Sequence, residues 1–246
     1  MNSITIFGDI HGNLPALTAV LADMDTRGLD HRYCLGDLVG YGVQPQEVVG
    51  VIRESGIPTL MGNYDQGVGH SSDDCGCAYR DPVAEALGKR SIAWTNAHTS
   101  AESKAFLRTL VDRIPLQLAD LRVLLVHGSP RRVNEYLYED RPAAGLERIM
   151  DAAGADVLVC GHTHLPYYRV LTSGRHVVNA GSVGKPKDGD PRACYVVLRA
   201  DGRDMDVEFI RVAYDVEAAA VAIEATAGHS PEMPAEFAEM LRVGRG

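Results

Sequence analysis

Short polar clusters recur along this chain, and most of them contain a glycine. In chain order they are Asp9-Ile10-His11, Gly36-Asp37, Gly62-Asn63-Tyr64-Asp65, His127-Gly128 and Gly161-His162-Thr163-His164. Asp-x-His and Gly-Asp are weak signals alone, because both occur in ordinary turns. The pair His162 and His164 is stronger, since alternate residues of an extended segment point the same way and would present two imidazoles together.

Each cluster follows an apolar run that is typical of a buried strand. These runs are residues 3–7, 32–35, 57–61, 122–126 and 156–160. A helix capped by Asn13 and a helix over 45–54 separate the first three, and this alternation implies a parallel sheet. Five strand ends in one sheet would converge on one edge. We therefore expect a single cluster of seven residues: Asp9, His11, Asp37, Asn63, His127, His162 and His164.

Such a cluster has the chemistry of a metal site. Buried without a cation, it would be costly. Mixed carboxylate and imidazole ligands suit manganese, iron or zinc better than calcium or magnesium alone. Seven ligands are too many for one ion that must also leave room for a substrate, whereas two ions sharing a bridging carboxylate fit. We expect two divalent metal ions, with manganese first and iron, zinc or nickel as alternatives.

The rest of the chain predicts an α/β protein in one domain, residues 1–246. Residues 82–110 have the pattern of two helices, and 116–118 with 122–126 that of a hairpin. Later elements follow without an internal repeat or a linker. They are a helix at 147–153, strands at 168–171, 176–179, 193–198 and 206–209, a helix at 216–226 and a shorter helix after Pro234. This order favours two sheets packed together with helices outside.

The composition indicates which binding partners and which cellular compartment to expect. The 246 residues are 46% hydrophobic and carry a formal net charge of −9, which argues against an extended nucleic-acid surface but not against a small phosphorylated substrate. No apolar run approaches the roughly 20 residues of a membrane helix. The five cysteines form no regular framework, which favours a reducing compartment, so we expect a cytoplasmic protein. The sequence carries no signal for an oligomeric state.

The order D-x-H, G-D, G-N-x-D, H-G, G-H-x-H resembles the calcineurin-like metallophosphoesterase superfamily. The segment from Asn179 to Gly184 is similar to a loop of its small prokaryotic phosphodiesterase branch. The resemblance implies a four-layer α/β/β/α sandwich of two mixed sheets. It also implies that Asp9, His11 and His164 hold one ion. Asn63, His127 and His162 would hold the other, and Asp37 would bridge both.

The implied activity is that of a hydrolase, a metal-dependent phosphoesterase in which a metal-activated hydroxide attacks the substrate. Asp37, Asn63, Tyr64 and Asp65 are the candidate catalytic residues. Many relatives carry a histidine at the position of Tyr64, where it can protonate the leaving group. Its absence favours phosphodiesters, with nucleotides among them, over monoesters. Tyr64 either lines the pocket or donates a hydrogen bond.

Further residues are weaker candidates for substrate contact. Arg131, Arg132 and Asn134 lie on the loop after His127, and arginine suits bidentate phosphate binding. Tyr136 ranks lower, and Tyr41 would pack rather than stack on a base. Lys185 and Lys187 are expected to be solvated, and Cys75-Gly76-Cys77 to be a surface loop.

Other functions stay open. A phosphomonoesterase or protein phosphatase would use the same centre. A dinucleoside polyphosphate hydrolase would tolerate the missing acid, because its leaving group is good. A binding module that has lost catalysis is a different class, and the intact ligand positions argue against it.

Overall fold

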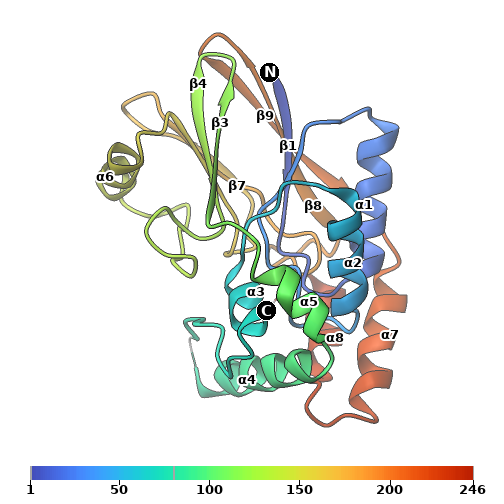
Figure 1. The fold of residues 1–246 in the computed structure, drawn as a ribbon. Coiled ribbons are helices and arrows are strands. Elements are labelled where there is room, and N and C mark those ends of the chain that lie inside the picture. The colour runs from blue at the N-terminus through green and yellow to red at the C-terminus, as the bar shows by residue number, and fades with distance from the viewer. Residues whose placement is uncertain (1, 80, 246) are drawn as a thin grey trace.

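The computed structural model describes residues 2–79 and 81–245, which form two β-sheets packed face to face with helices outside (Figure 1). The first sheet has the strand order β2 (Arg32–Cys34), β1 (Ser3–Phe7), β8 (Ala193–Asp201), β9 (Asp204–Val212). The second has the order β3 (Arg113–Leu118), β4 (Leu121–Val126), β5 (Val157–Cys160), β7 (His176–Asn179), β6 (Tyr167–Val170). The predicted fold class, two mixed sheets flanked by helices, is confirmed.

Both sheets are mixed, and each contains a parallel part. In the first sheet β1 pairs with β2 in parallel, whereas β8 and β9 are antiparallel. In the second sheet β4, β5 and β7 are parallel to one another, and β3 and β6 are antiparallel edge strands. Parallel neighbours end at the same edge, so each sheet presents adjacent carboxyl ends there.

The side chains of β4 show how the layers are held together. Val123 and Leu125 are buried in the core between the two sheets. Leu124 and Val126 alternate with them along the strand, so they point to the other face of the sheet. There they pack in the cluster that includes α6 (Ala143–Ala153). Because successive strand residues face opposite ways, a strand buried on both faces is a continuous apolar run.

Helices cover the outer faces of both sheets. Besides α6, the described helices are α1 (Leu14–Thr26), α2 (Pro45–Ser55), α3 (Asn63–Gly69), α4 (Pro82–Ala97), α5 (Ala101–Leu107), α7 (Val216–Ala227) and α8 (Glu236–Val243). Helices α1, α2 and α7 lie on one side of the molecule and α6 on the other (Figure 1). Asn13 caps α1 by accepting the Ala16 N–H at 3.1 Å, as the sequence predicts. None of the helices in the described ranges is long and apolar enough to cross a membrane.

Residues 57–61 differ from the prediction. They form no regular strand, and their backbone pairing consists of two isolated parallel bridges, Cys34 to Thr59 and Leu60 to Val111. Pro58 has no N–H to donate to a ladder, and the chain turns at Gly62 into α3. The prediction missed α3, a short helix that contains two glycines.

The core between the sheets should dominate stability. We expect Leu125→Ala, at a fully buried position in that core, to lower the free energy of unfolding by about 2–5 kcal/mol, because it leaves a cavity. Urea denaturation followed by circular dichroism measures the change. Val170→Ala, at a side chain that is 54% exposed, is the control and should change stability by less than about 0.5 kcal/mol. Equal effects would contradict this view of the core.

Candidate metal centre

The polar clusters meet at a seam between the two sheets. Asp9 and Asp37 follow β1 and β2 of the first sheet, and His127 and His162 follow β4 and β5 of the second. The expectation that all strand ends belong to one sheet was therefore wrong, because local alternation does not reveal which strands share a sheet. The convergence itself occurs, and every member is at most 4% exposed: Asp9, His11, Asp37, Asn63, His127, His162 and His164.

The cluster divides into two groups of potential ligands. Asp9, His11 and His164 form one, and Asp37, His127 and His162 form the other; within each, the ligand atoms lie within 4.8 Å of one another. In the first group His11 Nε2 is 3.1 Å from His164 Nε2, and His164 Nε2 is 3.3 Å from Asp9 Oδ1. Each group can hold one cation.

His162 and His164 belong to different groups, contrary to the prediction that they point the same way. The prediction assumed an extended backbone. Instead, both residues are in the left-handed region, with φ of 66° and 61°. The intervening turn directs one imidazole to each group.

Asp37 lies between the two groups. Its Oδ2 is 3.6 Å from His11 Nε2 and 3.5 Å from His127 Nε2. Asn63 joins the second group, because its Oδ1 lies 3.1 Å from His127 Nε2. One carboxylate oxygen thus faces ligand atoms of both groups, which is the geometry that a bridging ligand needs.

Backbone carbonyls fix the orientation of three imidazoles. The Nδ1 atoms of His11, His127 and His164 lie 3.0, 2.9 and 2.6 Å from the carbonyl oxygens of Val39, Leu35 and Lys185. A carbonyl can only accept, so each Nδ1 carries the hydrogen. This leaves the Nε2 lone pairs directed into the cluster, as in metal-bound histidines with an outer hydrogen-bond partner.

Burial keeps most of these imidazoles neutral. It lowers the pKa of His11 to about 3 and holds the pKa values of His162 and His164 well below the usual range. His127 differs: burial acts to lower its pKa, but the charge and hydrogen bond of Asp37 outweigh burial and raise it to about 9. Neutral imidazoles are the form that binds cations.

Two buried atoms of the candidate ligands are without a hydrogen-bond partner among the described residues. They are Asp9 Oδ1 and His162 Nε2, one in each group. Native proteins rarely bury such atoms unsatisfied, and a bound ion is one way of satisfying them. The donor set therefore fits two divalent cations, one in contact with each orphaned atom.

The backbone around the cluster is unusual. Of eight described non-glycine residues with positive φ, five are candidate ligands: Asp9, His11, Asp37, His162 and His164. Such conformations are uncommon outside glycine and concentrate at functional sites.

Two glycines allow the chain to approach these carboxylates. A Cβ at Gly62 would lie 2.0 Å from Asp37 Oδ1, and one at Gly161 would lie 2.6 Å from Asp9 Oδ2. Any larger residue would displace a candidate ligand, which explains the glycines before Asn63 and His162.

Asp65 lies behind the cluster. Its two oxygens accept the N–H groups of Leu38 at 2.9 Å and Gly62 at 3.0 Å, and it is fully buried. Burial and, next, the charge of Asp37 raise its pKa to about 7. Both oxygens are engaged by the backbone, so Asp65 ties the loop after β2 to the start of α3.

Tyr64 is packed against the first group. Its ring lies 5.5 Å from the His11 ring, edge to face, and 4.9 Å from the Tyr41 ring. It is 1% exposed, and its hydroxyl has no hydrogen-bond partner among the described residues. Burial, more than the neighbouring Tyr41, raises the pKa of Tyr64 well above the usual value.

The predicted substrate residues on the loop after β4 lie farther out. Arg131 and Arg132 are exposed, and Arg131 is paired with Glu135. Asn134 donates to the Gly76 carbonyl oxygen at 2.7 Å. All three line a separate surface hollow beside Glu135.

The sequence ranked Tyr136 low and did not identify Cys75 or Cys77 as residues that contact the cluster. The Tyr136 ring lies 4.0 Å from the His162 ring, and Asn63 donates to Cys77 Sγ at 3.1 Å. Cys75, which accepts from Asn63 through its carbonyl oxygen, is buried, so the prediction of a surface loop was wrong there. Lys185 is only 7% exposed, so the prediction that it is solvated was wrong. Only the proximity of Cys75-Gly76-Cys77 to a motif could have signalled these contacts.

Known proteins share this fold and much of the sequence. An uncharacterized protein of Methanocaldococcus jannaschii is 33% identical over 233 residues, covering 88% of this chain and 89% of its own. A metallophosphoesterase structure from Sphaerobacter thermophilus is 31% identical with a TM-score of 0.75, covering 99% of both chains. A hypothetical protein from Pyrococcus horikoshii has 25% identity and a TM-score of 0.81, covering 100% of this chain and 99% of its own.

The sequence profile of the calcineurin-like phosphoesterase superfamily domain matches residues 2–203, which include every candidate ligand. The family and the two ligand groups together indicate divalent metal ions. The chain therefore belongs to the calcineurin-like phosphoesterase superfamily, a family of hydrolases that act on phosphoester bonds.

Proposed function

We propose that this protein is a dinuclear metal-dependent phosphodiesterase acting on small phosphodiesters. One observation carries the proposal: Asp37 Oδ2 faces His11 Nε2 of one ligand group at 3.6 Å and His127 Nε2 of the other at 3.5 Å. This supports two cations sharing one carboxylate rather than two independent sites. When bound, the two cations supply activated water and neutralise the phosphoryl oxygens.

The residues of the chain hold this centre in position. Asp9, His11 and His164 would bind one cation, and Asn63, His127 and His162 the other; we favour manganese, with iron, zinc or nickel as alternatives. Asp65 contributes by fixing the backbone around Asp37 and Asn63. Arg131, Arg132 and Asn134 would meet only a substrate that reaches the outer hollow. The candidate ligands come from several parts of the chain and meet in one continuous structural unit. This supports the proposal of a single domain over residues 1–246.

The environment of Tyr64 supports diesters over monoesters. Its raised pKa keeps the hydroxyl protonated, so it is a poor proton donor to a departing alkoxide. Its ring is enclosed by His11 and Tyr41.

Five free cysteines support a reducing compartment, and we infer the cytoplasm.

Metal dependence and diester preference form the first test. After chelation and restoration of Mn²⁺, we expect bis-p-nitrophenyl phosphate to be hydrolysed at least about tenfold faster than p-nitrophenyl phosphate, a difference of about 1.4 kcal/mol in barrier. Chelator should abolish both reactions. Faster monoester cleavage would replace the diesterase by a phosphatase, and activity that survives complete metal removal would refute the metal mechanism.

Asp37→Asn tests the bridge. Loss of its charge should weaken retention of the cations and lower kcat/KM for the diester by about 100-fold or more, an effect of about 2.7 kcal/mol. Steady-state kinetics and metal content per chain are the measurements. Asp30→Asn, at an exposed carboxylate, is the matched control and should behave as wild type. Full activity with two ions retained in Asp37→Asn would overturn the shared carboxylate.

Tyr64→Phe separates packing from proton donation. Because the ring is enclosed and the hydroxyl stays protonated, we expect kcat to change by no more than about twofold, equivalent to roughly 0.4 kcal/mol. A series of aryl methyl phosphates with leaving groups of rising pKa provides the measurement. A loss that grows with leaving-group pKa would show instead that the hydroxyl donates in the transition state.

A further inference from the structure

A cavity of about 350 Å³ lies in front of the candidate metal centre. Its wall includes Thr163, which stands between His162 and His164 in the chain, and Cys77, which accepts from Asn63. The volume is within the range of small-molecule sites. A molecule in this cavity would therefore lie beside residues that neighbour the ligand groups, although none of the seven candidate ligands lines the cavity itself.

Aromatic rings dominate the wall. Tyr41, Tyr79, Tyr136, Tyr138 and Phe237 all line the cavity. Two of these rings touch candidate ligands directly: Tyr136 lies 4.0 Å from the His162 ring, and Tyr41 lies 4.8 Å from the His11 ring. Two short runs of rings thus extend from the ligand groups, Tyr136 with Tyr138 and Tyr41 with Phe237, as surfaces on which a planar group attached to the reacting phosphate could stack.

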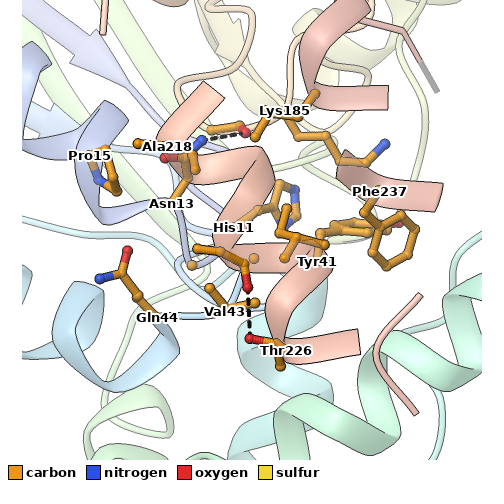
Figure 2. Close-up of a pocket in the computed structure, with 17 residues that line it drawn as sticks. His11, Asn13, Pro15, Tyr41, Val43, Gln44, Lys185, Ala218, Thr226 and Phe237 are labelled. Carbon is orange, nitrogen blue, oxygen red and sulfur yellow. Dashed lines mark hydrogen bonds between the residues drawn. The ribbon is translucent and has the colours of Figure 1, made fainter. Parts of the chain in front are cut away.

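Lys185 is the second feature of this wall. Its side chain is buried, and its Nζ lies 4.7 Å above the centroid of the Tyr41 ring. Its Nζ makes no hydrogen bond or ion pair with any of the described residues, although burying a polar group without such a partner is costly. Figure 2 shows Lys185, Tyr41 and Phe237 grouped beside His11, around an adjacent cavity that the same lysine borders.

Basic side chains outnumber acidic ones in the wall of this cavity. Lys185 and Lys187 line it against a single carboxylate, Asp81, whose Oδ1 already accepts two N–H groups at the start of α4. The chain has a net charge of −9. A basic side chain beside the centre can therefore bind a phosphate group, whose approach the rest of the acidic surface does not favour.

We propose that this cavity is a nucleotide-binding site, in which Lys185 binds an oxygen of the substrate phosphate and the tyrosine rings stack on the base. The proposal rests on the proposed function and names its substrate class. An apolar cavity without the lysine would suit any hydrophobic ester, and a lysine without the rings would suit any phosphate. Their combination next to the ligand groups selects a phosphate that carries a planar heterocycle.

Two diesters with the same leaving group test the base site. On the Mn²⁺-loaded full chain, kcat/KM for thymidine 5′-p-nitrophenyl phosphate should exceed that for methyl p-nitrophenyl phosphate by about tenfold or more, the effect of one stacked base. Tyr136→Leu should bring this ratio toward one. Tyr168→Leu, outside the cavity, should leave the ratio unchanged. Equal rates on the two esters in the wild type would overturn the base site while leaving the proposed function intact.

Lys185 is tested with the same esters. Lys185→Met should raise KM by about tenfold for both, because the phosphate is common to them, and Lys185→Arg should restore most of the loss. Lys104→Met, at a partly exposed lysine outside the cavity, is the matched control. Metal content per chain shows whether each variant keeps its centre. A Lys185→Met enzyme with its full metal content and the kinetics of the control would overturn the phosphate contact.

If the wild-type protein hydrolyses neither ester, the proposed function is refuted. The nucleotide-binding site is then tested by measuring ligand binding instead of hydrolysis. Calorimetric affinities of the Mn²⁺-loaded protein for thymidine 5′-monophosphate and methyl phosphate should still differ by about tenfold. Tyr136→Leu should remove the difference. Equal affinities in the wild type would overturn the nucleotide site.

Discussion

The burial of carboxylates at one seam is the constraint on which this structure depends. Asp9 and Asp37 lie at the ends of neighbouring strands, inaccessible to water, with imidazoles as their nearest side chains. Burying a carboxylate costs several kcal/mol even after the protein relaxes, unless an opposite charge is near. Three of the imidazoles are neutral, so they offer lone pairs rather than positive charge. Divalent cations match this environment in both charge and coordination.

The backbone is adapted to the same end. Left-handed conformations at non-glycine residues cost of order 1–3 kcal/mol each and persist only where the surroundings hold them. Here the hydrogen bonds of the strand ends do so: the N–H groups of Ile10 and His11 both lie 2.9 Å from the Asp37 carbonyl oxygen. The N–H of His162 donates to Asp9 Oδ2 across the seam at 3.0 Å. These bonds link the three loops that carry most of the candidate ligands.

The candidate metal centre lies within the region that the family profile matches, whereas residues beyond that region complete the wall of its cavity. The family profile ends at residue 203 and contains all seven potential ligands. Phe237 of α8 lies beyond it, yet packs edge to face on Tyr41 with ring centroids 5.0 Å apart. Helices α7 and α8 pack together with Leu87 and Trp94 of α4 in one apolar cluster. Elements outside the matched region thus complete the wall of a cavity that opens on a centre built by the family core.

The sequence by itself determined the residue types that can bind cations, their places after apolar runs, and the strands and helices that precede them. These are local properties, because the periodicity of a segment and its capping residues are set by near neighbours. Only the tertiary structure decided that the strand ends belong to two sheets, that the backbone at His162 and His164 is left-handed rather than extended, and that Lys185 is buried beside Tyr41. Each of those depends on contacts between residues far apart in the chain, which local patterns do not encode. The φ values of the turns depend on them too, since the hydrogen bonds that hold the turns join separate loops, and the one from His162 to Asp9 crosses from one sheet to the other.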